Sequence, residues 1–255
     1  MANVQNNLAK SFKALHKPGS PIILTNVYDA SFARAVASLP GAKAIATASY
    51  AVAEAAGMKD DDLTSDINIR AAKVITAAVK GSLKPVTVDI QDGYGEQLEE
   101  VIAELLQAGV VGVNIEDYDK EQKKMYGVSE AAARIKRVLD IARQYGVPDF
   151  VVNARCDILL QGGSLPEAIA RGQGYLAAGA TTAFVWGGLS RGGISRDEVT
   201  ELVKAFDGRL NVMLSGGLTT QQLADIGVAR ISIGPALYLA AMTKLKQDAE
   251  KILQG

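Results

Sequence analysis

The segment from Pro85 to Gly95 holds the residues best suited to chemistry. Its sequence, PVTVDIQDGYG, runs from short β-branched residues into two aspartates, Asp89 and Asp92, and then into a glycine-flanked turn. The β-branched residues are typical of a strand buried on both faces of a parallel sheet. Carboxylates at the end of such a strand can hold Mg²⁺, a hard cation that takes oxygen ligands and keeps several waters. The alternative is a plain Asp-Gly turn, whose aspartate bonds its own backbone.

Short apolar runs alternate with helix-like segments along the whole chain. We expect strands over Pro21–Thr25, Ala42–Ala46, Pro85–Asp89, Gly112–Ile115, Phe150–Asn153, Ala183–Val185, Asn211–Leu214 and Arg230–Ile233. The segments with helical periodicity are Asn7–Leu15, Ser31–Ser38, Ile67–Lys80, Gln97–Ala108, Glu130–Gln144, Leu165–Ala178, Arg196–Ala205, Thr220–Ile226 and Pro235–Leu253. Ser164 and Thr219 are expected helix N-caps.

This alternation predicts one α/β domain over residues 1–255, a (β/α)₈ TIM barrel, because no linker or composition break divides the chain. The alternative is a doubly wound open sheet. Such a sheet usually carries a glycine-rich phosphate loop after its first strand, and the segment from Asn26 to Asp29 is not one.

Composition excludes several classes of function. The formal charge is −1, from 27 basic and 28 acidic residues that are interspersed. No basic stripe predicts nucleic-acid binding, and no polybasic run predicts an anionic membrane surface. Cys156 is the only cysteine, so an intrachain disulfide is excluded and a reducing compartment is the simplest interpretation. No signal peptide or transmembrane span is visible, and we expect a soluble cytoplasmic protein.

In a barrel, the active site lies where the strands end. Asp89 and Glu116, with Asp92 through water, could hold one Mg²⁺ there. Arg155 could grip a carboxylate or phosphonate with its planar fork. A metal and an arginine facing a small dianion suit a 2-oxo acid, whose oxo group the metal would polarise. The alternatives are a structural pair of Arg155 with Asp157 or Glu116, and a solvated acidic pair at the end of the strand.

The order of the rim motifs resembles the isocitrate lyase/phosphoenolpyruvate mutase superfamily, and more narrowly its phosphoenolpyruvate phosphonomutase-like proteins. The resemblance runs from about Pro21 to Pro235. The motifs are Asn26-x-Tyr-Asp29, Thr47-x-Ser49, Gly57-x-x-Asp60, Asp89-x-x-Asp-Gly-Tyr-Gly95, Asn114-Ile-Glu-Asp117 and Asn153-Ala-Arg-x-Asp157. The resemblance implies a Mg²⁺-dependent barrel that makes or breaks C–C or C–P bonds next to a 2-oxo acid. It also implies a homotetramer, a dimer of dimers, in which the last helix (about 235–253) is exchanged between subunits.

The resemblance also assigns roles to single residues. Asp89 matches the metal-proximal aspartate, Glu116 its acidic partner, and Asp60 a catalytic aspartate beside the substrate. Arg155 and Ser49 would orient the substrate carboxylate. Tyr28 and Asn153 complete the expected substrate-binding set.

Departures from the family pattern are equally informative. Gln91 stands where a third carboxylate is expected on the metal side, which would weaken the site unless Asp92 compensates. Met125 follows Lys123-Lys124, where lyases carry a cysteine, so the thiol base is missing. The loop Lys120–Lys124 is either a lid that excludes water or a solvated charged face. Cys156 is expected to be a buried apolar filler, and His16, the only histidine, a surface residue.

Three functions remain open. The leading hypothesis is a Mg²⁺-dependent lyase or hydrolase acting on a small 2-oxo acid or its C3 adduct through a stabilised enolate. The alternatives are phosphonomutase-type C–P chemistry and a barrel that binds oxo acids without turning them over. The leading hypothesis predicts that Asp89→Ala and Arg155→Ala each abolish turnover and leave thermal unfolding nearly unchanged. The last helix is apolar on more than one face, which suits a partner subunit or burial under the N-terminal segment.

Overall fold

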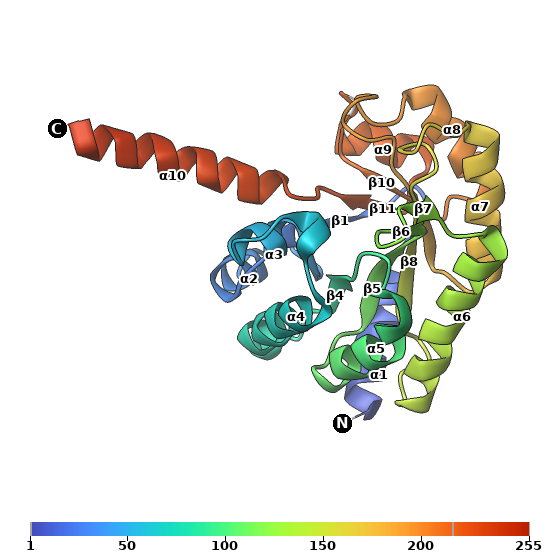
Figure 1. Cartoon of the computed structure of the whole chain (residues 1–255), viewed down its shortest axis with the longest axis horizontal. Coiled ribbons are helices and arrows are strands. Elements are labelled where there is room, and N and C mark those ends of the chain that lie inside the picture. Colours follow the sequence, from blue (N-terminus) through green and yellow to red (C-terminus); the bar gives the residue numbers. More distant parts are fainter. Residues whose placement is uncertain (1, 216, 255) are drawn as a thin grey trace.

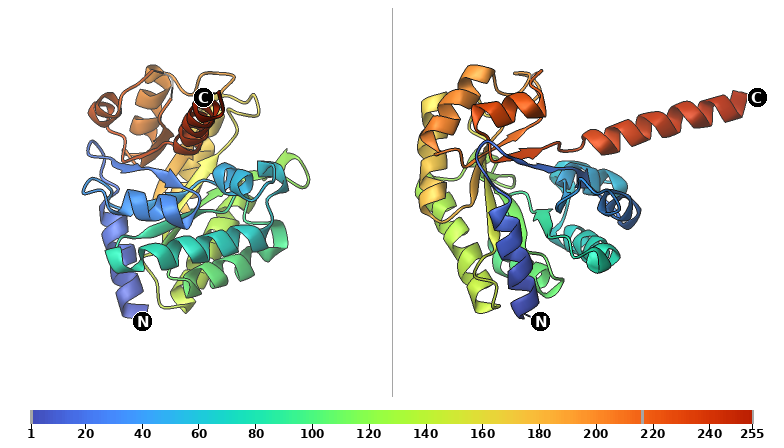
Figure 2. Two further views of the ribbon diagram at one scale, coloured as in Figure 1. Left: turned by 90° about the vertical axis from the view of Figure 1, so that its left-hand side faces the viewer. Right: turned by 180° about the vertical axis from the view of Figure 1, so that it is seen from behind.

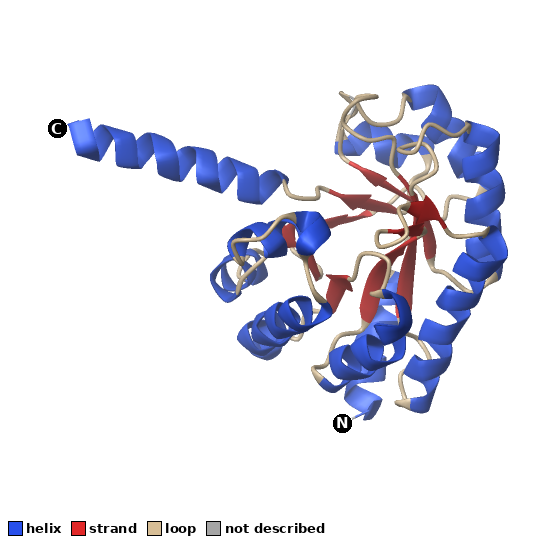
Figure 3. Ribbon diagram, viewed as in Figure 1, coloured by secondary structure: helices blue, strands red, loops and turns tan. Residues whose placement is uncertain are grey.

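The computed structural model describes residues 2–215 and 217–254, and its centre is a barrel of parallel strands. Neighbouring strands follow the order β1-β11-β10-β9-β8-β5-β4-β3-β2. Their bounds are β1 Ile22–Leu24, β2 Asn26–Val27, β3 Ile45–Thr47, β4 Val86–Asp89, β5 Gly112–Glu116, β8 Val151–Cys156, β9 Thr182–Val185, β10 Leu210–Met213 and β11 Arg230–Ser232. Figure 3 shows these strands surrounded by helices.

The first barrel strand is split in two, and this split closes the ring. β1 pairs with β11, whereas β2 pairs with β3, and Thr25 lies between them. The Asn26 side chain holds the junction: its amide donates to Thr47 O at 2.6 Å, and its carbonyl oxygen accepts from the backbone of Ile233 and Gly234. The predicted (β/α)₈ barrel and its eight strands are therefore confirmed, and the open doubly wound sheet is excluded.

The tightest strand contact is between β5 and β8, and it depends on one glycine. A Cβ atom on Gly112 would lie 2.8 Å from Val151 O and 3.1 Å from the Phe12 ring. Phe12 belongs to α1, which packs against the same strand. A side chain at position 112 would therefore push apart the two strands that carry Glu116 and Arg155.

Helices cover the outside of the barrel. The described helices are α1 Ala2–Ala14, α2 Ala30–Ala37, α3 Ser49–Ala55, α4 Ser65–Val79, α5 Leu98–Gln107, α6 Val128–Gln144, α7 Leu165–Ala177, α8 Arg196–Ala205, α9 Thr220–Ile226 and α10 Ala236–Gln254. All nine predicted helices are present. Ser164 and Thr219 cap α7 and α9 in reciprocal capping boxes, as predicted.

Two elements of the rim were not predicted. α3 begins at Ser49, two residues after the end of β3, in a segment for which no helix was predicted. Strands β6 (Tyr118–Asp119) and β7 (Lys124–Met125) form an antiparallel hairpin that contains the lysine-rich loop. Both elements lie beside the carboxyl ends of the barrel strands, so they help to shape the site.

The C-terminal helix α10 leaves the barrel and projects away from it (Figure 1, Figure 2). None of its described residues is buried, so the alternative of burial under the N-terminal segment is wrong. It contacts β2, and its Tyr238 ring meets Tyr28 edge to face at 4.9 Å. Ile23 on β1 is 43 % exposed, and none of the described helices covers it.

The structure corrects the prediction made for His16. His16, which follows α1, was expected to lie at the surface, but its Nε2 is buried and its ring packs on Phe12. Burial and the charge of Arg230 lower the pKa of His16 to about 3, so the imidazole is neutral at physiological pH. Among the described residues, no helix has the length and apolar character that a bilayer crossing requires.

Candidate active site

A cavity of about 500 Å³ opens at the carboxyl ends of the barrel strands. Its polar lining comes from almost every barrel strand and the loops that follow: Asn26, Thr47, Ser49, Asp60, Thr87, Asp89, Asn114, Arg155, Ser215, Arg230 and Ser232. Its apolar wall consists mainly of Phe184, Trp186, Leu189, Met213, Leu214, Pro235 and Leu239. The predicted location of the site at this end of the barrel is therefore supported by a cavity of ligand size.

Asp89, the last residue of β4, is held in place by four neighbours. Its Oδ2 accepts from Ser49 N at 3.1 Å, and its Oδ1 accepts from Asn114 Nδ2 at 2.9 Å and from Gln91 N at 3.4 Å. Its own backbone N–H donates to Thr47 Oγ1 at 2.9 Å. The carboxylate therefore has a fixed orientation in the cavity.

A chain of hydrogen bonds continues from Asp89 across the barrel interior. Asn153 Nδ2 donates to Asn114 Oδ1 at 2.7 Å, and Thr182 Oγ1 donates to Asn153 Oδ1 at 2.6 Å. These residues are buried, and they lie opposite one another in the register of β4, β5, β8 and β9. Asn153 was predicted to bind substrate; it lies outside the cavity lining, and its position is that of a support for Asn114 and Asp89.

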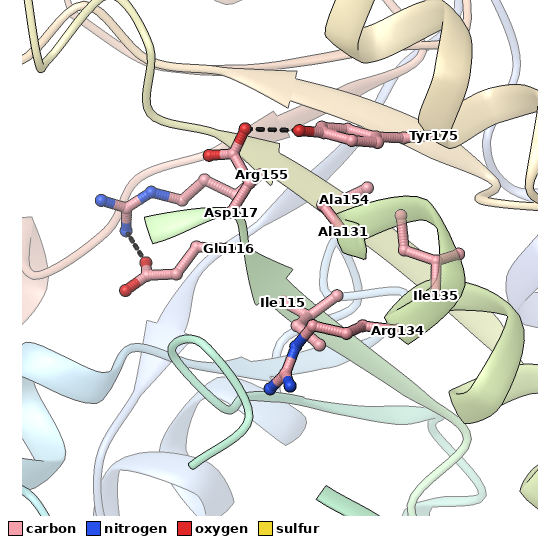
Figure 4. A pocket seen from close by; sticks show the side chains of 9 residues that line it. All are labelled: Ile115, Glu116, Asp117, Ala131, Arg134, Ile135, Ala154, Arg155 and Tyr175. Carbon is pink, nitrogen blue, oxygen red and sulfur yellow. Dashed lines mark hydrogen bonds and ion pairs between the residues drawn. The ribbon is translucent and has the colours of Figure 1, made fainter. Parts of the chain in front are cut away.

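Arg155 is paired with two carboxylates. Its Nη1 lies 2.9 Å from Glu116 Oε2, and its Nε donates to Asp157 Oδ1 at 2.7 Å. Figure 4 shows Glu116 and Arg155 facing each other. The guanidinium carbon also lies 5.1 Å from the Trp186 ring centre. The structural pairing that the sequence left open is thus present, although Arg155 also lines the cavity.

The charges in this group shift its pKa values. Burial alone would lower the pKa of Arg155, but the charges of Asp157 and Glu116 raise it above the ordinary value. Burial raises the pKa of Glu116 well above its usual range; Arg155 opposes this shift, and Asp157 and Asp89 add to it. Glu116 is therefore far more easily protonated than a surface glutamate.

Asp60 reaches the cavity from the loop after α3, in the short helix η1 (Asp60–Asp62). Gln91 Nε2 donates to both Asp60 O and Asp60 Oδ1, at 2.8 and 3.0 Å. Lys120 Nζ donates to Gln91 Oε1 and to Leu63 O, each at 2.7 Å. Gln91, which the sequence singled out as a missing carboxylate, therefore joins Asp60 to the β6–β7 hairpin.

The loop Lys120–Lys124 has one anchored end and one solvent-exposed end. Lys120 packs over the Tyr94 ring at 4.8 Å and is fixed by the contacts just described. Lys123 and Lys124 are exposed to solvent. The end of the loop is thus the predicted solvated charged surface, whereas its closure as a lid stays a prediction.

A cation fits the electrostatics of this cavity. Burial raises the pKa of Asp60, and the next largest cause is the charge of Asp89, which also raises the pKa of Glu116. Three carboxylates thus share one region. Among the described residues, no three Asp, Glu, His or Cys side chains are placed to coordinate a single ion directly. Mg²⁺ needs no such group, since one carboxylate and several waters satisfy it.

Two predicted site residues lie elsewhere. Asp92 is buried, and its carboxylate accepts from Tyr94 N and from the Tyr126 hydroxyl, at 3.0 and 3.2 Å. It is outside the cavity lining, because Gln91 has a positive φ of 52° and turns the chain after Asp89. Tyr28 is also outside the lining, since its ring packs between Phe32 and Tyr238. We therefore leave both residues out of the proposed site.

Other neighbours of the site have structural roles. Asp117 accepts from the Tyr175 hydroxyl (Figure 4). It also pairs with Arg171 at 3.2 Å. Cys156 is fully buried, as predicted for an apolar filler, and burial raises the pKa of its thiol. Thr87 and Arg230 also line the cavity, although each lies in a strand and has the sequence pattern of a core position, so neither was predicted as a site residue.

Comparison with known proteins agrees with this geometry. Residues 12–253 match the family model of phosphoenolpyruvate phosphomutase. A crystal structure of a Burkholderia cenocepacia protein assigned to the phosphonomutases superposes with a TM-score of 0.88 and is 36 % identical, covering 97 % of this chain and 99 % of that one. An uncharacterised Mycobacterium tuberculosis protein is 32 % identical over 96 % of this chain and 90 % of its own length.

A third relative covers less of the chain. An oxaloacetate decarboxylase of Rhodopseudomonas palustris is 32 % identical over 55 % of this chain and 50 % of its own length. The rim motifs, the barrel and the family match therefore agree along almost the whole sequence. The chain belongs to the phosphoenolpyruvate phosphomutase family.

Proposed function

We propose that this protein is a Mg²⁺-dependent lyase or hydrolase that cleaves a C–C bond next to the oxo group of a small 2-oxo acid or its C3 adduct. The observation that carries the proposal is that Asp60, Asp89 and Arg155 line one cavity, with Glu116 beside it in an ion pair with Arg155. Its relatives are named as lyases, mutases and a decarboxylase, which supports an enzyme of this general kind.

The proposed metal position follows from the donors. Asp89 would hold the ion directly, and Asp60 and Glu116 would act through bound water. When bound, Mg²⁺ would supply Lewis-acid polarisation of the oxo group.

The remaining roles belong to side chains of this chain. Ser49 and Arg155 would orient the substrate carboxylate, Arg155 through the edge of its guanidinium that Glu116 and Asp157 leave open. Asp60 would accept or deliver the proton at the reacting carbon, since burial and Asp89 raise its pKa toward the range useful for acid–base work.

A calorimetric titration tests this proposal. Oxalate, which mimics an enolate, should bind in the presence of Mg²⁺, and Asp89→Asn should weaken that binding at least about 100-fold, or roughly 2.7 kcal/mol. The matched control is Asp197→Asn, which removes an exposed carboxylate from α8. Oxalate binding that is unaffected by Mg²⁺ and by Asp89→Asn would refute the metal site. Metal-dependent binding would justify turnover assays with oxaloacetate and methylisocitrate.

Phosphonomutase-type C–P chemistry is the second candidate. The match to the phosphoenolpyruvate phosphomutase model favours it, as does the 36 % identical relative assigned to the phosphonomutases. Turnover of phosphonopyruvate, with none of the carboxylate substrates, would select this reaction.

We also propose that α10 is exchanged between subunits of a homotetramer. The support is the exposed helix itself, together with the uncovered Ile23 on the barrel. A helix from another copy would cover the outer face of β1.

A further inference from the structure

The floor of the cavity carries polar groups that lack partners. Arg230, the first residue of β11, is 3 % exposed, and its Nε and Nη1 have no hydrogen-bond partner among the described residues. Thr87 Oγ1, on β4, is likewise buried and without a partner. Both residues line the cavity. Buried donors usually have a hydrogen-bond partner, so unpaired donors on two residues that line one cavity are candidates to bind a polar group of a ligand.

The two arginines of the cavity differ in their charge balance. Arg155 makes two ion pairs, whereas Arg230 makes none with any described residue. Burial lowers the pKa of Arg230 to about 9, so the guanidinium stays charged at neutral pH. The negative charge of Asp89 opposes this shift, although Asp89 lies beyond ion-pair distance. On the other side lies His16, which is neutral. Arg230 is therefore the uncompensated cation of the cavity lining.

A buried charge without a partner is costly for a protein, and a bound anion would offset that cost. Thr87 precedes Asp89 by two residues, so both side chains point into the barrel, with Thr87 about 7 Å deeper along the strand. The floor thus lies below the carboxylate that would hold the metal. An anionic group there belongs to the far end of a ligand whose other end is at the rim.

We propose that Arg230 and Thr87 form a second anion subsite, which binds the distal carboxylate or phosphonate of the substrate. The preferred substrate is then a dianion whose two charged groups are separated by several bonds, rather than a compact 2-oxo acid. This inference rests on the proposed function, because it assumes that the proximal end of the ligand lies at Asp89 and Arg155.

Titrations with ligands of two lengths test this subsite. Oxalate and succinate are titrated with Mg²⁺ into the wild type, Arg230→Met and Thr87→Val, and phosphonopropionate replaces succinate in a third series. Arg230→Met should weaken succinate or phosphonopropionate at least about tenfold, and Thr87→Val about threefold, with oxalate changed less than about twofold. The better of the two long ligands identifies the distal group. Arg209→Met, which removes an exposed arginine, is the control and should change neither ligand.

The outcomes separate this subsite from the metal site. Equal weakening of oxalate and succinate by Arg230→Met, or no weakening of either, would overturn the second subsite and leave the metal site intact. Failure of the wild type to bind any of the three ligands would refute both proposals. The melting temperature of Arg230→Met is the folding control, and we expect it to equal or exceed that of the wild type, since the variant loses an unpaired buried charge.

Discussion

The two halves of the barrel mouth are built differently. Strands β3, β4, β5 and β8 end in charged and hydrogen-bonded side chains, including Asp89, Glu116 and Arg155. Strands β9 and β10 and the segment after β11 supply mostly apolar lining, such as Phe184, Trp186 and Met213. The outside also differs: helices cover the first half, whereas no described helix covers β1 beside β11, because α10 projects away (Figure 2).

The two halves of the barrel mouth therefore suit different roles. The polar half is fixed by reciprocal hydrogen bonds, as catalytic groups need to be if they are to keep their geometry. The apolar half offers area and shape to a ligand. Leu239 links the cavity to the projecting helix, since it lines the cavity and lies in the first turns of α10. Assembly could therefore change the cavity wall while leaving the carboxylates in place.

The largest effect is expected from a change in α10. Leu239, Met242, Leu245 and Ile252 are exposed at helical spacing and form an apolar stripe. Leu245, at 61 % exposure, should be buried in an oligomer, where it would contribute about 1.5–3 kcal/mol per subunit. Leu245→Glu should therefore convert the oligomer to smaller species in size-exclusion chromatography with light scattering.

The matched control for this change is Gln247→Glu, which places the same charge on the opposite side of α10 and should leave the oligomer intact. A wild-type protein that is monomeric at micromolar concentration would refute the exchange of α10.

Much of this polar half could be predicted from the sequence. The strands are short, buried and separated by glycine and helix caps, so their existence and order followed from periodicity. Asp60, Asp89, Glu116 and Arg155 could be placed at the rim because each follows a strand or matches a motif. The C-terminal helix was also predictable, because its apolar residues occupy more than one face.

Local side-chain direction was less predictable. Asp92 lies next to the site in sequence, but a left-handed residue at Gln91 turns its carboxylate toward Tyr126. Arg230 has the position of a core strand residue, and only the closed barrel shows that it faces the same cavity as Arg155. Such relations depend on strand register and closure, which periodicity does not encode.

The next effect, smaller than the sum over the four exchanged helices of a tetramer, is expected from Arg155→Met, which breaks the polar half itself. The sequence led us to expect nearly unchanged unfolding for Arg155→Ala. The structure gives a reason to expect the opposite, because the loss of Arg155 strands the carboxylates of Glu116 and Asp157. Removing one partner of a buried ion pair typically costs about 3–5 kcal/mol.

Urea unfolding measures this loss for Arg155→Met. Arg196→Met, at an exposed site in α8, is the control and should change the free energy of unfolding by less than about 0.5 kcal/mol. If both variants unfold at the same urea concentration, then Glu116 and Asp157 do not depend on Arg155 for their compensation.

The smallest expected effect lies at the junction of the two halves, where Thr182 on β9 supports Asn153 on β8. Thr182→Val removes the hydroxyl that donates to Asn153 Oδ1, and leaves that buried oxygen unpaired at a cost of about 1–3 kcal/mol. Because Asn153 holds Asn114, and Asn114 holds Asp89, metal-dependent oxalate binding should also weaken, by up to about tenfold.

Thr181→Val is the matched control, since the Thr181 hydroxyl is buried without a partner among the described residues and its loss breaks no hydrogen bond. Equal effects of the two substitutions on oxalate binding would mean that Asp89 is oriented by its nearest neighbours alone. A larger effect of Thr182→Val would mean that the apolar half reaches the metal site through the barrel interior.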